Sequence, residues 1–174
     1  MLSMGVIVVV VLLFVGLYGG FSFSPGRPTD SGPVPTADAI TAFADAPRRL
    51  PFTPAVPTRI PGDWHANSAA ITNPDTVAAG TPLTVRGGWL VTGGRFIALV
   101  ASNSPPDELL RSEFGAAPPD TERVTAGGAD WTVTTGVRGE SAWYRAAPGG
   151  VTYLITGSAD VSAFRTLAAS IAGS

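Results

Sequence analysis

The chain has 174 residues, among them 11 arginines and no lysine, 13 acidic residues and a formal net charge of −2. A chain so close to neutral lacks the positive surface that nucleic-acid binding requires, so we expect no nucleic-acid partner. The sequence holds no cysteine, which excludes disulfides, thiolate metal ligands and cysteine nucleophiles.

The first segment predicts a membrane anchor. Residues 1–24 contain no Asp, Glu, Lys, Arg or His, and residues 5–23 (GVIVVVVLLFVGLYGGFSF) are almost wholly apolar. About 20 helical residues cover the roughly 30 Å hydrocarbon core, so we assign residues 1–23 to one transmembrane helix. A cleaved signal peptide is the alternative, with GFS at 20–22 as its cleavage motif. The apolar run exceeds the roughly 7–15 residues of a signal peptide's core, which favours an uncleaved anchor in the cell membrane.

Residues 24–49 predict a linker that contains a short helix. Its first half is rich in proline and small polar residues, which is typical of a semi-extended linker. Residues 36–49 (TADAITAFADAPRR) predict the helix, with Ile40, Phe43 and Ala44 on one face.

Residues 50–174 predict one domain. The proline-rich segment 50–64 cannot form a central strand or a helix interior. We expect it to lie over the domain and to hold Phe52 and Val56 against the surface. Residues 64–71 follow as the first candidate strand.

A hairpin is the next predicted element. Residues 83–91 and 95–102 are strand-like and flank Thr92-Gly93-Gly94, where glycine tolerates the positive φ angles of a tight turn. Gly87 and Gly88 interrupt the first arm and predict a bulge or the close approach of another backbone.

The second half predicts a helix, four strands and a closing helix. SPPDELLRSEFG reads as a helix that Ser104 caps and Gly115 ends. Glycine-rich turns separate the four strand candidates, which are residues 121–126, 129–135, 141–147 and 151–157. The closing helix, residues 160–172, shows one apolar face, made of Val161, Phe164, Leu167, Ala168 and Ile171.

These elements predict an α+β fold in which helices cover one face of an antiparallel sheet. Roughly 125 residues can bury about 65% of their unfolded surface, which is enough for one independent core.

Several motifs resemble those of a known family. They are the apolar N-terminal span, PGDWHANS at 61–68, LVTGGRFIALVASN at 90–103, ADW at 129–131, AWYR at 142–145, GGVTYLITGSA at 149–159 and FRTLAASI at 164–171. Over nearly its whole length the chain resembles an actinobacterial family of single-span membrane proteins, domain of unknown function 4245. The resemblance implies a cytoplasmic N-terminus and a domain outside the cytoplasm, and it brings no catalytic residues. Ala101 departs from the pattern, because we expect a glutamine there.

The chain's one histidine lies in DWHANS. Strand alternation puts Asp63, His65 and Asn67 on one face and Ser68 on the other, which argues against a Ser-His-Asp triad. A metal site from the first three would have one imidazole and one carboxylate, a poor set of ligands. We therefore expect His65 to be a solvated or hydrogen-bonded strand residue, and we expect no catalytic residue, no metal site and no cofactor.

Aromatic residues give the candidate binding surface. The tryptophans could line a carbohydrate or lipid pocket, but core packing is favoured because large aromatic side chains dominate core energetics. Trp143 and Tyr144 are adjacent in a strand and face opposite sides, so one of them could be exposed. We select Trp143, Tyr144 and Arg145 as the candidate binding residues.

The expected function is that of a membrane-anchored extracytoplasmic domain that binds a partner protein or an envelope component. The sequence offers few nucleophiles, bases and metal ligands, which favours binding over catalysis. One alternative is a hydrolase-type envelope enzyme built from dispersed carboxylates such as Asp63, Asp130 and Glu140, since residues far apart in sequence can meet in space. The other is an accessory subunit of a membrane complex, held through its span.

Overall fold

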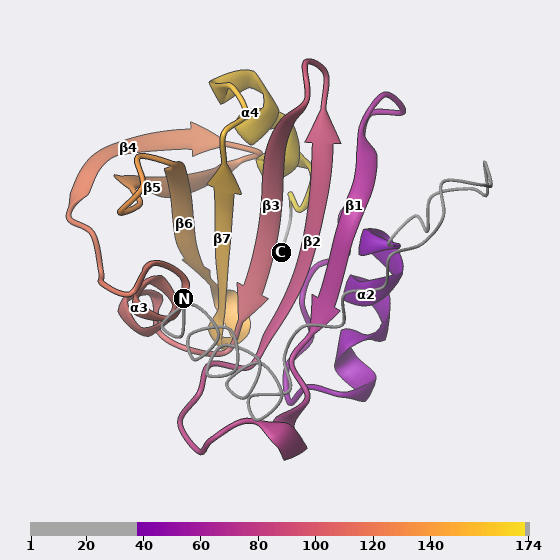
Figure 1. Cartoon of the computed structure of the whole chain (residues 1–174), viewed down its shortest axis with the longest axis vertical. Helices are drawn as coiled ribbons and strands as arrows, with labels where there is room; N and C mark the ends of the chain where they lie inside the picture. The colour runs from indigo at the N-terminus through magenta and orange to yellow at the C-terminus, as the bar shows by residue number, and fades with distance from the viewer. Residues whose placement is uncertain (1–37, 173–174) are drawn as a thin grey trace, which may run out of the picture. The chain divides into compact units, whose positions relative to one another are not determined.

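The structure of the chain is a computed structural model that describes residues 38–172 (Figure 1). The predicted transmembrane helix, residues 1–23, and the linker up to residue 37 lie outside this range. Among the helices within it, none has the length and apolar character that crossing a membrane requires.

Seven strands form one antiparallel sheet in the order β1-β2-β3-β7-β6-β5-β4 (Figure 1). Two meanders, β1 to β3 and β4 to β7, join where β3 pairs with β7. All the strands that the sequence predicts are formed, and the strands are β1 (His65–Ile71), β2 (Thr84–Val91), β3 (Arg95–Ser102), β4 (Asp120–Ala126), β5 (Ala129–Thr135), β6 (Ser141–Ala147) and β7 (Val151–Gly157).

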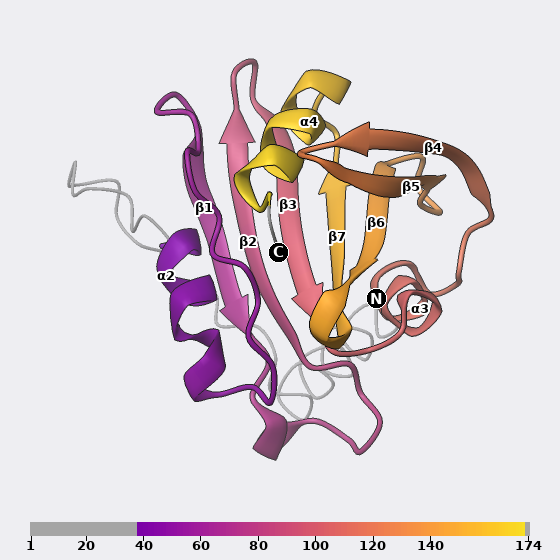
Figure 2. The ribbon, with the colours of Figure 1, turned by 180° about the vertical axis from the view of Figure 1, so that it is seen from behind.

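Helices lie on both faces of this sheet. The helices are α2 (Ala39–Asp45), α3 (Pro106–Phe114) and α4 (Val161–Ser170), with 3-10 turns η1 (Ala46–Arg48), η2 (Pro74–Thr76) and η3 (Pro148–Gly150). Helices α2 and α4 pack into one apolar cluster with alternate residues of the strands (Figure 2). Helix α3 packs into a second cluster with the intervening residues, so it covers the opposite face.

The expectation that helices cover one face only is therefore wrong, and the central strands give the physical reason. Leu99 and Ile155 belong to the α2 and α4 cluster, whereas Val100 and Leu154 belong to the α3 cluster. All four side chains are fully buried. Strands that are apolar on both sides need cover on both faces of the sheet.

Helix α2 belongs to the core of the domain. Ala39 and Phe43 are buried on the side of α2 that contacts β1 and β2, while Ile40, which the pattern placed on the apolar face, is 42% exposed. Asp38 caps the helix by accepting a hydrogen bond of 2.8 Å from the backbone amide of Thr41. The folded domain thus includes residues that the sequence pattern placed in the linker.

The segment between α2 and β1 lies over the α2 and α4 face. Phe52 is buried in the core as expected, whereas Val56 is 38% exposed. The segment is held instead by its backbone, because the amide of Ala55 donates to the Tyr153 hydroxyl at 2.7 Å and that of Thr58 donates to the Ser170 carbonyl at 2.9 Å.

Helix α3 ends as predicted but begins differently. Gly115 closes it in the left-handed conformation with φ 77°. The capping position is Pro105, which offers no side-chain hydrogen bond. Ser104 lies one residue before it, and its amide donates to the Ser102 hydroxyl at 3.1 Å. Helix α4 buries the predicted face except for Val161, which is 57% exposed.

The two glycines in β2 allow close contacts on opposite faces, but the neighbouring atoms belong to side chains and not to the backbone that the sequence predicts. A Cβ atom at Gly87 would lie 2.9 Å from the Cβ atom of Ala39 and 3.1 Å from the ring of Phe43. A Cβ atom at Gly88 would lie 2.3 Å from the hydroxyl of Ser68. The bulge of this region falls in β1, between Ala66 and Ser68.

We expect Gly87→Ala to lower the free energy of unfolding by about 1–3 kcal/mol, because the added methyl group forces α2 away from the sheet. Gly62→Ala is the matched control, since a Cβ atom there meets nothing within 4 Å. Its effect should stay within about 0.5 kcal/mol. Denaturant unfolding of the detergent-solubilised chain, followed by tryptophan fluorescence, measures both; equal effects would contradict the close packing of α2.

Candidate functional site

A cleft of about 660 Å³ opens on the α3 side of the sheet. Strand β2 and the end of α3 form one wall, and the turn between β5 and β6 forms the other. The start of β3 and the end of β7 form the floor. The cleft therefore brings together residues from five segments that are far apart in sequence. Four of the lining residues are charged, namely Arg86, Glu113, Arg138 and Glu140.

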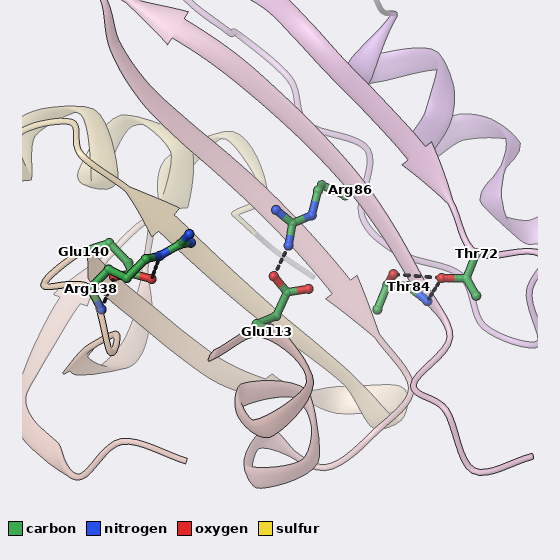
Figure 3. Close-up of polar contacts among 6 residues, drawn as sticks. All are labelled: Thr72, Thr84, Arg86, Glu113, Arg138 and Glu140. Carbon is green, nitrogen blue, oxygen red and sulfur yellow. Dashed lines mark hydrogen bonds and ion pairs between the residues drawn. The ribbon is translucent and has the colours of Figure 1, made fainter. Parts of the chain in front are cut away.

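An ion pair occupies one wall. Arg86 rises from β2 on the α3 side, between Ala70 of β1 and Val100 of β3. Its Nη2 atom contacts Oε2 of Glu113 at the end of α3 (Figure 3). Their side chains are 32% and 16% exposed, and burial lowers the pKa of Arg86. The pair is thus largely withdrawn from water but borders the cleft.

The opposite wall is the turn between β5 and β6, whose backbone amides donate hydrogen bonds to Glu140. The amide of Gly136 donates to the Glu140 carbonyl at 2.8 Å, and the amide of Arg138 donates to Oε2 of Glu140 at 2.9 Å. A Cβ atom at Gly136 would lie 2.5 Å from the Glu140 carboxyl carbon, so glycine is what makes room for this side chain. Glu140 is only 17% exposed, whereas Arg138, 3.7 Å away, is 85% exposed (Figure 3).

The floor depends on a glycine at the end of β7. Gly157 has a φ of 153°, and a Cβ atom there would lie 2.2 Å from the carbonyl oxygen of Phe96. That carbonyl accepts from the amide of Ser158 at 2.8 Å, and the Ser158 hydroxyl accepts from the amide of Phe96 at 3.1 Å. Thr156 and Ser141 add hydroxyl groups to the lining. The cleft thus combines paired charges, hydroxyl groups and aromatic carbon.

The predicted binding residues are divided between the two faces of β6. Trp143 is 3% exposed and packs against Phe164, with 5.3 Å between the ring centroids. The Arg145 guanidinium lies between two aromatic rings, 5.3 Å from that of Trp131 and 5.2 Å from that of Tyr153. Burial lowers the pKa of Arg145. Both residues therefore contribute to the packing of the α2 and α4 face.

Tyr144 faces the other way and packs against the α3 cluster. Its hydroxyl donates to Oδ1 of Asp120 at 2.6 Å. Burial, followed by the hydrogen bond and charge of Asp120, raises the pKa of Tyr144 to about 12. The structure therefore does not bring Trp143, Tyr144 and Arg145 together on one surface.

The histidine motif differs from the prediction in one respect. The β1 bulge pairs His65 with Leu90 and Ser68 with Gly88, so both side chains lie on the same face of the sheet. Within residues 38–172 no hydrogen bond joins His65 to Ser68 or Asp63, and Asp63 instead accepts from the Thr92 hydroxyl at 2.7 Å. Across the same part of the chain no three His, Asp or Glu side chains gather as metal ligands would.

The dispersed carboxylates do not converge either. Asp63 precedes β1 and Asp130 lies in β5, and four strands separate these two strands in the sheet. Asp130 accepts a hydrogen bond of 2.8 Å from the Thr125 hydroxyl. Of the three candidates, Glu140 alone lines the cleft.

The sequence pattern missed Arg86 and Glu113. Glu113 follows the buried residues Leu109 and Leu110 by four and three positions, so it lies on the apolar side of α3. An acidic residue on the apolar side of a helix is unusual, and this signal in the sequence could have identified Glu113. Arg86 offers a weaker signal, as a charged residue in the middle of an apolar strand.

We expect Glu113→Gln to lower the free energy of unfolding by about 1–2 kcal/mol, because the partly buried Arg86 loses its counter-charge. The control is Asp107→Asn on the same helix, where the pair with Arg111 is 57% and 55% exposed. That substitution should cost at most about 1 kcal/mol. Denaturant unfolding compares the two, and a larger cost for the surface pair would contradict the role of burial.

Tyr144 gives a pH-dependent prediction. Its pKa is raised in the fold, so its contribution to stability is complete below pH 10 and is lost as the pH rises toward 12. Asp120→Asn should lower this pKa but leave it above 10, because burial is the largest cause. Ultraviolet titration of the tyrosinate measures it, with Tyr144→Phe to assign the signal and Asp130→Asn as control. An unchanged pKa in Asp120→Asn would contradict the contact.

Comparison with known proteins gives a family but no characterised relative. No curated protein and no solved structure gives a significant match to the chain. The family described as "Protein of unknown function (DUF4245)" matches residues 1–171, which is nearly the whole chain, and this confirms the family resemblance drawn from the motifs. The chain belongs to the DUF4245 family.

Proposed function

We propose that the chain is a membrane-anchored domain outside the cytoplasm that binds an envelope component or a partner protein in the cleft beside α3. The anchor is the uncharged, apolar run at residues 5–23. The proline-rich stretch of about 13 residues that follows could extend to roughly 40 Å, a tether that lets the domain reach ligands near the membrane.

The ion pair of Arg86 and Glu113 carries this proposal. Taking two charges out of water costs free energy, and apolar residues of similar volume stabilise a fold as well or better. Stability alone therefore gives little reason to keep the pair at the edge of the α3 cluster. Placed on a cleft wall, the same two groups offer fixed donors and acceptors to a bound molecule. The volume of about 660 Å³ lies within the range of small-ligand sites.

A second candidate is a hydrolase, and one observation favours it. Glu113 and Glu140 stand on opposite walls of the same cleft, and both are largely buried. Most glycoside hydrolases use two carboxylic acid side chains, one on each side of the bond that is cleaved. The two functions differ in outcome, because a hydrolase releases product from a bound glycan over time and a binding domain leaves it intact.

In-cell photocrosslinking tests the proposal. A photoreactive amino acid at Val137, which is 65% exposed beside Arg138, should capture the ligand or partner. The same amino acid at Val56, an exposed position on the segment between α2 and β1, is the matched control and should capture less. Adding Glu113→Gln to the Val137 variant should reduce capture by about tenfold, since an ionic hydrogen bond is lost. Equal capture at both positions would overturn the assignment to the cleft.

The same cells test the anchor. We expect the crosslinked chain to stay in the membrane fraction after an alkaline wash that releases peripheral proteins. Replacing residues 1–23 by a cleavable secretion signal should release the chain and keep capture through Val137. Loss of capture in the released chain, with the fold intact, would instead favour an accessory subunit held through its span. If the chain without substitutions is recovered from the culture fluid and its N-terminal apolar segment has been cleaved off, the anchor is refuted.

A further inference from the structure

We infer that the cleft takes a neutral, hydroxyl-rich ligand, a saccharide unit of an envelope polymer. This inference rests on the proposed binding function of the cleft and names the chemical class of its ligand. It follows from the way in which the charges of the lining are already paired.

The charges of the cleft cancel. Arg86 is paired with Glu113 and Arg138 with Glu140, so the lining holds two positive and two negative groups. An anionic ligand would have to compete with Glu113 for a guanidinium that is already engaged and partly buried. A cationic ligand would meet the same obstacle at the two glutamates. Displacing Arg86 or Glu113 from its partner leaves a partly buried charge without a counter-charge, which makes a ligand that breaks this pair costly. Arg138 is exposed, but an anion that approaches it also meets the carboxylate of Glu140, 3.7 Å away.

A neutral ligand can use the pairs without breaking them. A guanidinium has five N–H donors and a carboxylate can accept about four hydrogen bonds. The contact between Arg86 and Glu113 joins one nitrogen and one oxygen, so each group keeps capacity for other bonds (Figure 3). A hydroxyl group both donates and accepts, and can therefore bridge the two members of one pair.

The rest of the lining matches the same chemistry. Thr156 and Ser141 bring hydroxyl groups to the floor and to the β6 side, and Phe96 and Phe114 bring aromatic rings. A sugar ring presents hydroxyl groups around its edge and C–H groups on its faces, so it can bond to the first kind of group and pack on the second. The cleft offers both kinds together.

Binding of the full chain to defined probes tests the inference. The chain is solubilised in a detergent whose head group contains no sugar, because a glycosidic head group would compete. The probes are neutral oligosaccharides with and without N-acetyl groups, uronic-acid oligosaccharides, and zwitterionic dipeptides. Saturation-transfer NMR detects binding, and calorimetry measures the affinity. We expect the neutral oligosaccharides to bind and the charged probes to bind at least tenfold more weakly.

Arg138→Ala is the informative variant. Its side chain is 85% exposed, so its loss should leave the fold intact. The affinity for the neutral probe should fall by about tenfold, because one charged hydrogen-bond donor is removed. Arg111→Ala, an exposed arginine on α3 outside the cleft, is the control and should bind like the unaltered chain.

The outcomes separate the inference from the proposed function. Tenfold weakening in Arg138→Ala alone supports the saccharide. Equal affinity in both variants places binding elsewhere and overturns it. Charged probes that bind in the cleft in place of neutral ones overturn the ligand class and leave the proposed binding function standing. No binding by any neutral probe also overturns the inference, and if Val137 then captures nothing in cells, the proposed function falls with it.

Discussion

The pairing of β3 with β7 determines how the rest of the domain is arranged. From Ile97 to Ser102 and from Val151 to Thr156 every residue is buried, so the centre of the sheet is covered on both faces. Burial of this apolar surface is the main source of stability available to the fold. It requires α2 and α4 on one side and α3 on the other. Without α3, the side chains of Val100 and Leu154 would face water.

The cleft exists because the cover on the α3 side is incomplete. Helix α3 has nine residues, and β6 is the strand with which it makes most contact. Arg86 of β2 lines the cleft beside α3, and Glu113 near the end of α3 forms an ion pair with it. The ion pair therefore lies at a boundary between apolar core and water. At this boundary the two side chains are mostly shielded from water, which strengthens their hydrogen bonds. They also line the cleft, so a ligand can contact them.

Much of the fold could be predicted from local pattern, and the site could not. Alternating residues and glycine turns identified the strands, and Gly115 identified the end of α3. The local pattern does not show that both faces are covered, because this cover depends on the pairing of β3 with β7, whose partners are 50 to 60 positions apart from Ser102↔Thr152 to Ile97↔Gly157. The bulge that puts Ser68 on the same face as His65 is a one-residue event that alternation cannot show. Arg86 and Glu113 are separated by 27 positions and meet only through the sheet and the helix packed on it.

Trp143, one of the residues predicted as a binding surface, holds from behind a strand that leads into the cleft. Strand β6 begins at Ser141 in the lining, and two residues later Trp143 packs on Phe164 in the core. The anchored strand fixes the position of the turn that carries Glu140. Groups held on rigid elements lose little freedom when a ligand binds, so even weak polar contacts can give net affinity. The neutral ligand that we infer would depend on such contacts, so its site gains affinity from being rigid before the ligand binds.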